Sequence, residues 1–239
     1  MKPLGTGRCL KWTILWLVAC HVAVAQDKVV QLDLSSLAVD EELPDVRADN
    51  ILPMTTPVLC AKGNDSSVRV EKDVIMDGTP VGDGKPVLVM RKRPGDSMVG
   101  FAFEVSDTSA LRPEGKLSLE MKGIVKKDLA GNVAVSFMGS GKLISFFQIT
   151  VNGGVQLIDT VSNKVLELGS IPMGQPFGLI KYELDFATGK ASVAVDGEKL
   201  GESAGFVTST PVSGVIFGLT GVEQNGEIAF EDIQMEASQ

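Results

Sequence analysis

The sequence predicts an all-β protein built as a two-sheet antiparallel sandwich or jelly roll. Apolar and polar residues alternate over many short runs, and each run stops at Gly, Asn, Asp or Pro. No segment of helical periodicity extends beyond about ten residues. A sustained period of two gives each strand one buried and one solvated face, which is typical of antiparallel sheets packed face to face. About a dozen such strands indicate one large β domain.

Residues 1–25 have the pattern of an export signal. Three basic residues precede an apolar run that starts at Trp12, and Ala23-Val24-Ala25 supplies a small-residue cleavage pattern. We expect cleavage between Ala25 and Gln26 and free export to the periplasm or the extracellular space. The alternative is a bacterial lipobox that ends at Cys20, with Cys20 acylated as the new first residue. The apolar residues that follow Cys20 favour free export.

Removal of the signal leaves 214 of the 239 residues, with no His, no Trp, one Cys (Cys60) and one Tyr (Tyr182). The charge balance becomes 19 basic residues, after three of 22 are removed, against 30 acidic residues, or a net −11. Such a surface repels phosphate backbones and anionic membranes, so nucleic acid is not an expected partner. No second apolar stretch is long enough to span a membrane, and a single cysteine permits no internal disulfide.

The first part of the exported chain, residues 26–66, is expected to hold a first strand and an irregular segment packed on the sandwich. The strand is predicted at Val29–Leu34, and the residues after it are acidic and contain Pro. The sandwich itself is expected over residues 67–239, within the same domain. Its strand pattern resumes at Val68–Ile75, and the pairs Asp77-Gly78 and Asp83-Gly84 mark turns.

From Met98 the alternation becomes regular, and it places Phe147 in the core with Phe146 on the opposite face. Tight hairpin turns are predicted at three dipeptides that tolerate positive φ. They are Asn152-Gly153, Asp196-Gly197 and Asn225-Gly226.

The last third of the chain carries a layout that resembles a known superfamily. The segment 177–186 leads through Thr188-Gly189 into 191–197, which ends in Asp-Gly, and the chain closes on Phe230-Glu231-Asp232-Ile233. This layout resembles the concanavalin A-like lectin/glucanase superfamily, including laminin-G-like modules of exported bacterial proteins. Their typical final strand has Asp where this chain has Glu231. The resemblance implies a jelly-roll fold, but the superfamily contains lectins, glycosidases, lyases and adhesive modules, so it selects no function.

The sequence lacks the catalytic residues that enzymes of this superfamily use. Glycosidases of the fold use paired carboxylates on one strand, and the nearest run holds Glu227 and Glu231 without the central Asp. The lyases need a His and Tyr pair, and the exported chain has no His. Tyr182 alternates with apolar residues and is expected to face the core. Because the exported chain has no His, metal sites built on imidazole and Ser-His-Asp hydrolysis are also excluded.

Three further motifs bear on function. Residues 139–142 resemble a phosphate loop, but they join two strands and read as a hairpin turn. The run 91–93 is interpreted as a charged strand end. Asp73, Asp77 and Asp83 cluster around two turns and form a candidate structural calcium site, because hard oxygen ligands on loops suit Ca²⁺.

The sequence therefore favours an exported, non-enzymatic, lectin-like sandwich that binds a glycan or serves as a structural component of the cell envelope. The alternative hypothesis is a glycan-active hydrolase or lyase that uses carboxylates without histidine. No cofactor is expected beyond the candidate calcium.

Overall fold

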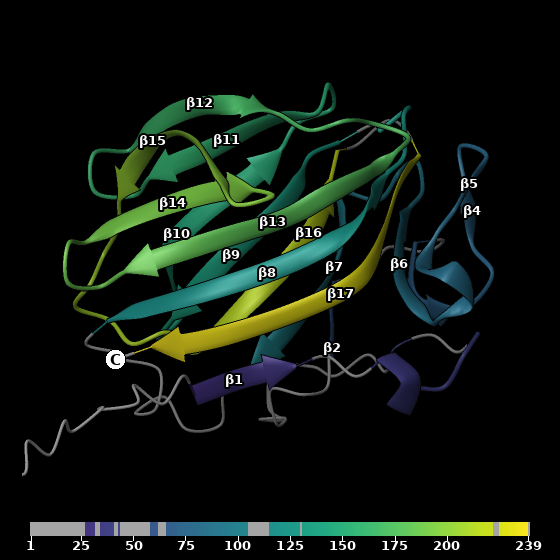
Figure 1. The fold of residues 1–239 in the computed structure, drawn as a ribbon, viewed down its shortest axis with the longest axis horizontal. Coiled ribbons are helices and arrows are strands. Elements are labelled where there is room, and N and C mark those ends of the chain that lie inside the picture. Colours follow the sequence, from purple (N-terminus) through teal and green to yellow (C-terminus); the bar gives the residue numbers. More distant parts are fainter. Residues whose placement is uncertain are drawn as a thin grey trace, which may run out of the picture.

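The structure, a computed structural model, describes residues 27–31, 34–40, 43, 58–61, 66–104, 115–129, 131–221 and 225–238. The side chains of 27–31, 36, 58–61 and 104 are not among the described parts. These residues form an all-β, two-sheet antiparallel jelly-roll sandwich, which confirms the predicted fold class (Figure 1). The predicted export signal, with Cys20 and Ala25, and the predicted new N-terminus Gln26 lie outside the described residues.

One sheet has eight strands, and all of its neighbours pair antiparallel. In spatial order it contains β15 (Glu198–Gly205), β14 (Lys190–Val195), β13 (Pro176–Asp185), β8 (Lys116–Val125), β17 (Gly226–Ser238), β6 (Val87–Lys92) and β3 (Ser67–Glu71), with β1 (Asp27–Gln31) also paired to β17.

The second sheet has seven strands, again antiparallel throughout. In spatial order it contains β12 (Lys164–Ser170), β11 (Gly154–Asp159), β10 (Lys142–Ile149), β9 (Val133–Gly139), β16 (Gly214–Thr220), β7 (Met98–Glu104) and β2 (Val58–Ala61). The chain crosses repeatedly between the sheets: β6, β8 and β17 lie in one, while β7 and β16 lie in the other.

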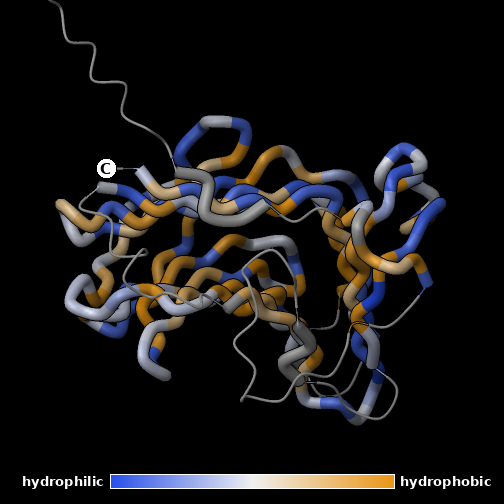
Figure 2. Tube along the Cα trace, turned by 90° about the horizontal axis from the view of Figure 1, so that it is seen from below, coloured by the Kyte–Doolittle hydropathy of each residue, from blue (hydrophilic) through white to orange (hydrophobic). Residues whose placement is uncertain are grey.

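The core lies between the two sheets and is rich in Phe. Phe101 and Phe217 stack with ring centroids 4.6 Å apart, and Phe230 of the opposite sheet meets Phe217 edge-on at 5.4 Å. Such aromatic contacts add to the burial of apolar area, which is the main driving force for folding. Figure 2 shows hydrophobic and hydrophilic residues alternating along the strands, as the period of two predicts.

Tyr182 lies fully inside this core, as predicted from its alternation with apolar residues. Its hydroxyl donates a hydrogen bond to Ser145 Oγ, which links β13 of one sheet to β10 of the other. Burial raises the pKa of the Tyr182 phenol, and the hydrogen bond with Ser145 opposes that shift. The phenol is therefore a structural group, held neutral in an apolar interior.

Three hairpins use two-residue turns in which both residues have positive φ. Asp77-Gly78 has φ of 52° and 83°, Ser140-Gly141 has 49° and 71°, and Asp196-Gly197 has 51° and 81°. This left-handed pair matches the twist of the flanking strands, and Asp and Gly accept it readily. The segment 139–142 is thus a hairpin turn, as its sequence context indicated.

A small hairpin, β4 (Ile75–Met76) and β5 (Thr79–Pro80), packs outside the eight-stranded sheet. It is followed by the 3-10 turn η2 (Gly82–Gly84). The hairpin region and the sheet share a second hydrophobic cluster of buried residues, which are Val74, Met76, Val81, Val87, Val89, Ile124 and Ala229. Glu231 Oε1 accepts a hydrogen bond from the Gly82 N–H at 3.2 Å and fastens the 3-10 turn to β17.

Two local predictions were wrong. The first strand ends at Gln31, and Leu34 begins the 3-10 turn η1 (Leu34–Ser36), whose leucine is buried in the core. Asn225-Gly226 closes no hairpin, because β16 and β17 belong to different sheets. Gly226 instead starts β17.

Of the described residues between 26 and 66, β1 extends one sheet and β2 extends the other. Leu43 packs in the core and its N–H donates to Val68 O at 3.0 Å. The described residues include no helix long and apolar enough to cross a membrane.

Candidate functional site

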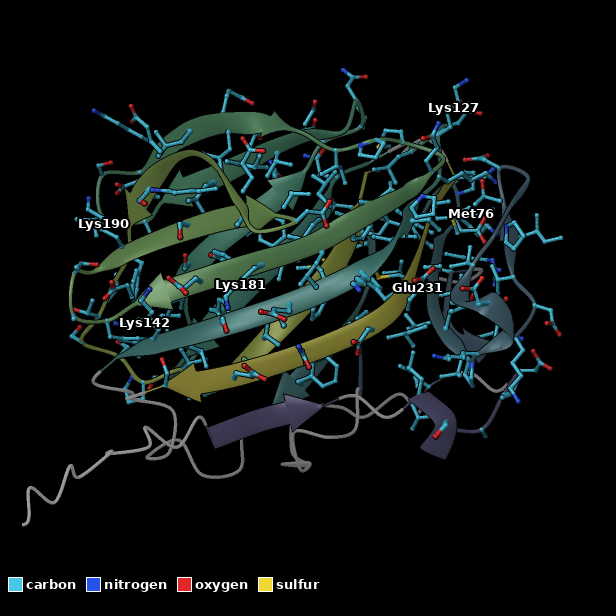
Figure 3. The ribbon with its side chains drawn as sticks, viewed as in Figure 1. Met76, Lys127, Lys142, Lys181, Lys190 and Glu231 are labelled. Carbon is cyan, nitrogen blue, oxygen red and sulfur yellow. The ribbon has the colours of Figure 1, made fainter. Side chains whose placement is uncertain are left out.

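The two sheets present different outer faces. On the eight-stranded sheet this face is charged, and Lys181 projects from it on β13 (Figure 3). Lys181 forms an ion pair with Glu120 at 3.1 Å, and Lys116 forms one with Glu183 at 2.8 Å. Burial raises the pKa of Glu120, but hydrogen bonds from Gln234 and Lys181 outweigh it, so the pKa is lowered overall. These two ion pairs lie on a solvated sheet surface.

The outer face of the seven-stranded sheet carries a different arrangement, a row of side-chain amides that ends in a carboxylate. Asn132 Nδ2 donates to Gln148 Oε1 at 3.1 Å, and Gln148 Nε2 donates to Gln156 Oε1 at 2.5 Å. Gln156 Nε2 then donates to Glu167 Oε1 at 2.6 Å. We call these four residues the amide ladder. It crosses from the start of β9 to β12.

Strand register produces the ladder. Gln148 pairs with Gln156 across β10 and β11, and Gln156 pairs with Glu167 across β11 and β12. Directly opposed residues on one face of a sheet have their Cβ atoms about 5 Å apart, within reach of side-chain hydrogen bonds. The inward neighbours Phe147 and Leu157 anchor the two strands in the core. The amides are therefore held on a rigid support.

A mainly apolar row runs beside the ladder, two residues away from it on β10, β11 and β12. Its members are cross-strand neighbours on six adjacent strands: Ala102, Ile216, Ser136, Phe146, Ile158 and Val165. Phe146 is half-buried on the face opposite the core residue Phe147, as the alternation predicted. Val165 is 54% exposed on the edge strand. Polar and apolar rows lie side by side on one face.

The ladder does not exhaust the hydrogen-bonding capacity of its amides. A glutamine side chain has two N–H donors and a carbonyl oxygen with two lone pairs. Gln148 and Gln156 each use one N–H and one lone pair within the ladder. Each therefore keeps one donor and one acceptor for other partners. A hydroxyl group, which both donates and accepts, is complementary to such a pair.

The candidate calcium ligands occupy turns in the structure. Asp73, Asp77 and Asp83 have φ of 54°, 52° and 47°, so each provides a left-handed turn residue. Asp77 Oδ2 accepts a hydrogen bond from the Lys127 N–H at 2.5 Å, at the end of the molecule where Met76 and Lys127 lie (Figure 3). Among the described residues, no three His, Cys, Asp or Glu side chains are grouped so that they could hold a metal ion. Calcium binding stays a prediction.

Glu227 and Glu231 have separate structural partners. Glu227 Oε1 accepts from Arg91 Nε at 2.7 Å, and Glu231 bonds the Gly82 N–H. Arg91 also pairs with Glu71, whose hydrogen bond is the main cause that raises the Arg91 pKa above its usual value. The run 91–93 is thus tied into the sheet, in agreement with its interpretation as a charged strand end.

Neither family models nor curated proteins match this sequence. Among solved structures, a sialidase matches with a TM-score of 0.54 and 13% identity, over 71% of this chain and 17% of the sialidase. A carbohydrate esterase from the Shiga toxin-encoding bacteriophage phi24B matches with a TM-score of 0.51 and 11% identity, over 90% of this chain and all of the esterase (100%). At such identities the likeness establishes the β-sandwich fold. The ligand has to be argued from the site.

Proposed function

We propose that this chain is an exported, non-enzymatic sandwich of the concanavalin A-like type that binds glycans through the outer face of its seven-stranded sheet. The observation that carries the proposal is the amide ladder of Asn132, Gln148, Gln156 and Glu167. Its spare donors and acceptors suit hydroxyl groups of a sugar. Ligand sites combine apolar surface with a few placed polar groups in this way.

The apolar row beside the ladder supports the same ligand. Sugar rings carry C–H surfaces as well as hydroxyls, and Phe146 and Ile158 supply apolar contact one row from Gln148 and Gln156. Two proteins of similar fold are named a sialidase and a carbohydrate esterase. Their names agree with a role in carbohydrate recognition.

Binding is favoured over hydrolysis by the carboxylates of this face. Two-carboxylate glycosidases need a pair of carboxyl groups about 5–10 Å apart across the scissile bond. Among the outward strand positions whose side chains are described on the seven-stranded sheet, Glu167 is the single carboxylate, and it accepts a hydrogen bond from Gln156. A glycan on this face would contact amides that can hydrogen-bond its hydroxyl groups, without a pair of carboxylates to cleave it.

A glycan array run on residues 26–239, with and without calcium, tests this function. The Gln156→Ala variant should lose binding by at least about tenfold. Its matched control is Gln234→Ala, because Gln234 also donates to a carboxylate, that of Glu120 at 2.8 Å, on the opposite face. If no glycan on the array binds, glycan binding is refuted and a structural role in the cell envelope is favoured.

Export is a separate part of the proposal. Mass spectrometry of the mature protein should find Gln26 at its N-terminus. An acylated Cys20 would replace free secretion by lipid anchoring.

A further inference from the structure

We propose that the amide ladder selects neutral, hydroxyl-rich oligosaccharides and rejects glycans that carry carboxylate or sulfate groups. This inference rests on the proposed function and specifies its ligand class. It follows from the direction of the hydrogen bonds in the ladder and from the charges around it.

The direction of the ladder is fixed by Glu167. An ionised carboxylate accepts hydrogen bonds and donates none, so Gln156 must turn its NH₂ group toward Glu167. The carbonyl oxygen of Gln156 then faces Gln148 and accepts from it, and Gln148 in turn accepts from Asn132. One charged group at the edge strand thereby orients three amides. Glu167 acts as a positioning residue for the row.

The charge of the face is negative. Among the outward positions of β7, β9, β10, β11, β12 and β16 whose side chains are described, the only ionised side chain is that of Glu167. Lys164 is paired in register with Asp159 at the edge of the sheet. The Asp159 carboxylate accepts a hydrogen bond from the Gly205 N–H of the other sheet, so these two residues lie on the inner side of the seven-stranded sheet and not on its outer face. A ligand carboxylate on the ladder would therefore meet repulsion from Glu167.

Recognition of anionic groups by proteins usually relies on Arg or Lys. Two cations of the eight-stranded sheet, on the opposite face of the molecule, have ion-pair partners: Lys181 pairs with Glu120 and Lys116 pairs with Glu183. The whole chain carries a net charge of −8, which adds a general repulsion of polyanions. A neutral glycan is repelled neither by Glu167 nor by the net charge, and it can use the spare donor and acceptor of Gln148 and Gln156.

The test compares neutral hexasaccharides of glucose, mannose and xylose with oligouronates, sialyllactose and sulfated oligosaccharides, at one ionic strength. The wild type should bind one or more neutral chains and none of the anionic ones within tenfold of that affinity. Glu167→Lys should raise the affinity for anionic relative to neutral chains by at least tenfold. The control Asp232→Lys makes the same charge change at an exposed position of β17, on the outer face of the opposite sheet, and should change that ratio less than twofold because salt screens distant charges.

Circular dichroism and melting curves confirm that each variant folds. Anionic chains that bind the wild type and are lost in Gln156→Ala would overturn this inference while the proposed function stands. A ratio that responds equally to Glu167→Lys and Asp232→Lys would also overturn it. If no glycan binds, or if Gln156→Ala leaves glycan binding unchanged, the proposed function is overturned as well.

Discussion

The hydrogen bond between Tyr182 and Ser145 joins the two sheets inside the core, and its removal gives a sharp test of the sandwich. Tyr182→Phe leaves the buried Ser145 hydroxyl without this partner, and Ser145→Ala does the same to the Tyr182 hydroxyl. Stranding one buried polar group costs about 1–3 kcal/mol of stability. We expect each single variant to lose about 2 kcal/mol of unfolding free energy.

The double variant should be less destabilised than the sum of the two single variants. When both partners are removed, no polar group is stranded, so the loss should stay close to that of one single variant. The coupling free energy is then about 1–2 kcal/mol, which urea unfolding followed by circular dichroism resolves. Strict additivity would refute the contact between Tyr182 and Ser145, and with it the stacking of β13 on β10.

The pH dependence of stability tests the same burial. The folded-state pKa of Tyr182 is raised by burial, whereas the unfolded chain titrates near the ordinary value of about 10. A raised folded pKa contributes stability that is present below the unfolded pKa and is lost as pH rises above it. Stability should therefore fall by about 1.4 kcal/mol per pH unit above about pH 10, a slope that Tyr182→Phe removes. Tyr182 is the only tyrosine of the chain, so tyrosinate absorbance reports this transition directly. Tyrosinate formation at pH 10 in the folded protein would refute the burial.

Three other predictions follow from packing and from the turns. Gly123→Ala should destabilise strongly, because its Cβ would stand 2.1 Å from Ala229 O, and a loss below about 1 kcal/mol by urea unfolding would contradict that geometry. Phe217→Ala should cost about 3–5 kcal/mol in the same assay, and a cost typical of surface sites would argue against the Phe cluster. If the aspartate turns hold calcium, calcium chloride raises the melting temperature in a concentration-dependent way and Asp77→Asn abolishes the rise, whereas equal melting curves reject the site.

Local patterns in the sequence were sufficient to predict the fold class. In β8, Leu117, Leu119 and Met121 alternate with polar residues and are buried in the core. The Asp196-Gly197 turn is predicted because both residues tolerate positive φ, which is a property of the dipeptide itself, and the structure confirms it. Asn225-Gly226 failed because the same dipeptide rule carries no information on which sheet the next strand joins.

The amide ladder was missed, although part of its signal was present. Gln148 and Gln156 are equidistant from Asn152, and the observed three-residue turn 151–153 pairs them across β10 and β11. A two-residue turn at Asn152-Gly153 would instead place Gln148 opposite Leu157. Glu167 is harder to place, because a bulge shifts the register between Val155 and Gln156. An alternating pattern reveals which face a residue occupies, but it does not reveal such a shift along the partner strand.

Side-chain amide NMR of residues 26–239 tests the central claim most directly, with the neutral oligosaccharide that binds most tightly as the titrant. The NH₂ resonances of Asn132, Gln148 and Gln156 should shift in proportion to occupancy, while that of Gln234 on the opposite face stays fixed. Saturable binding that moves Gln234 and leaves the three ladder amides unchanged would contradict the assignment of the glycan site to the seven-stranded sheet.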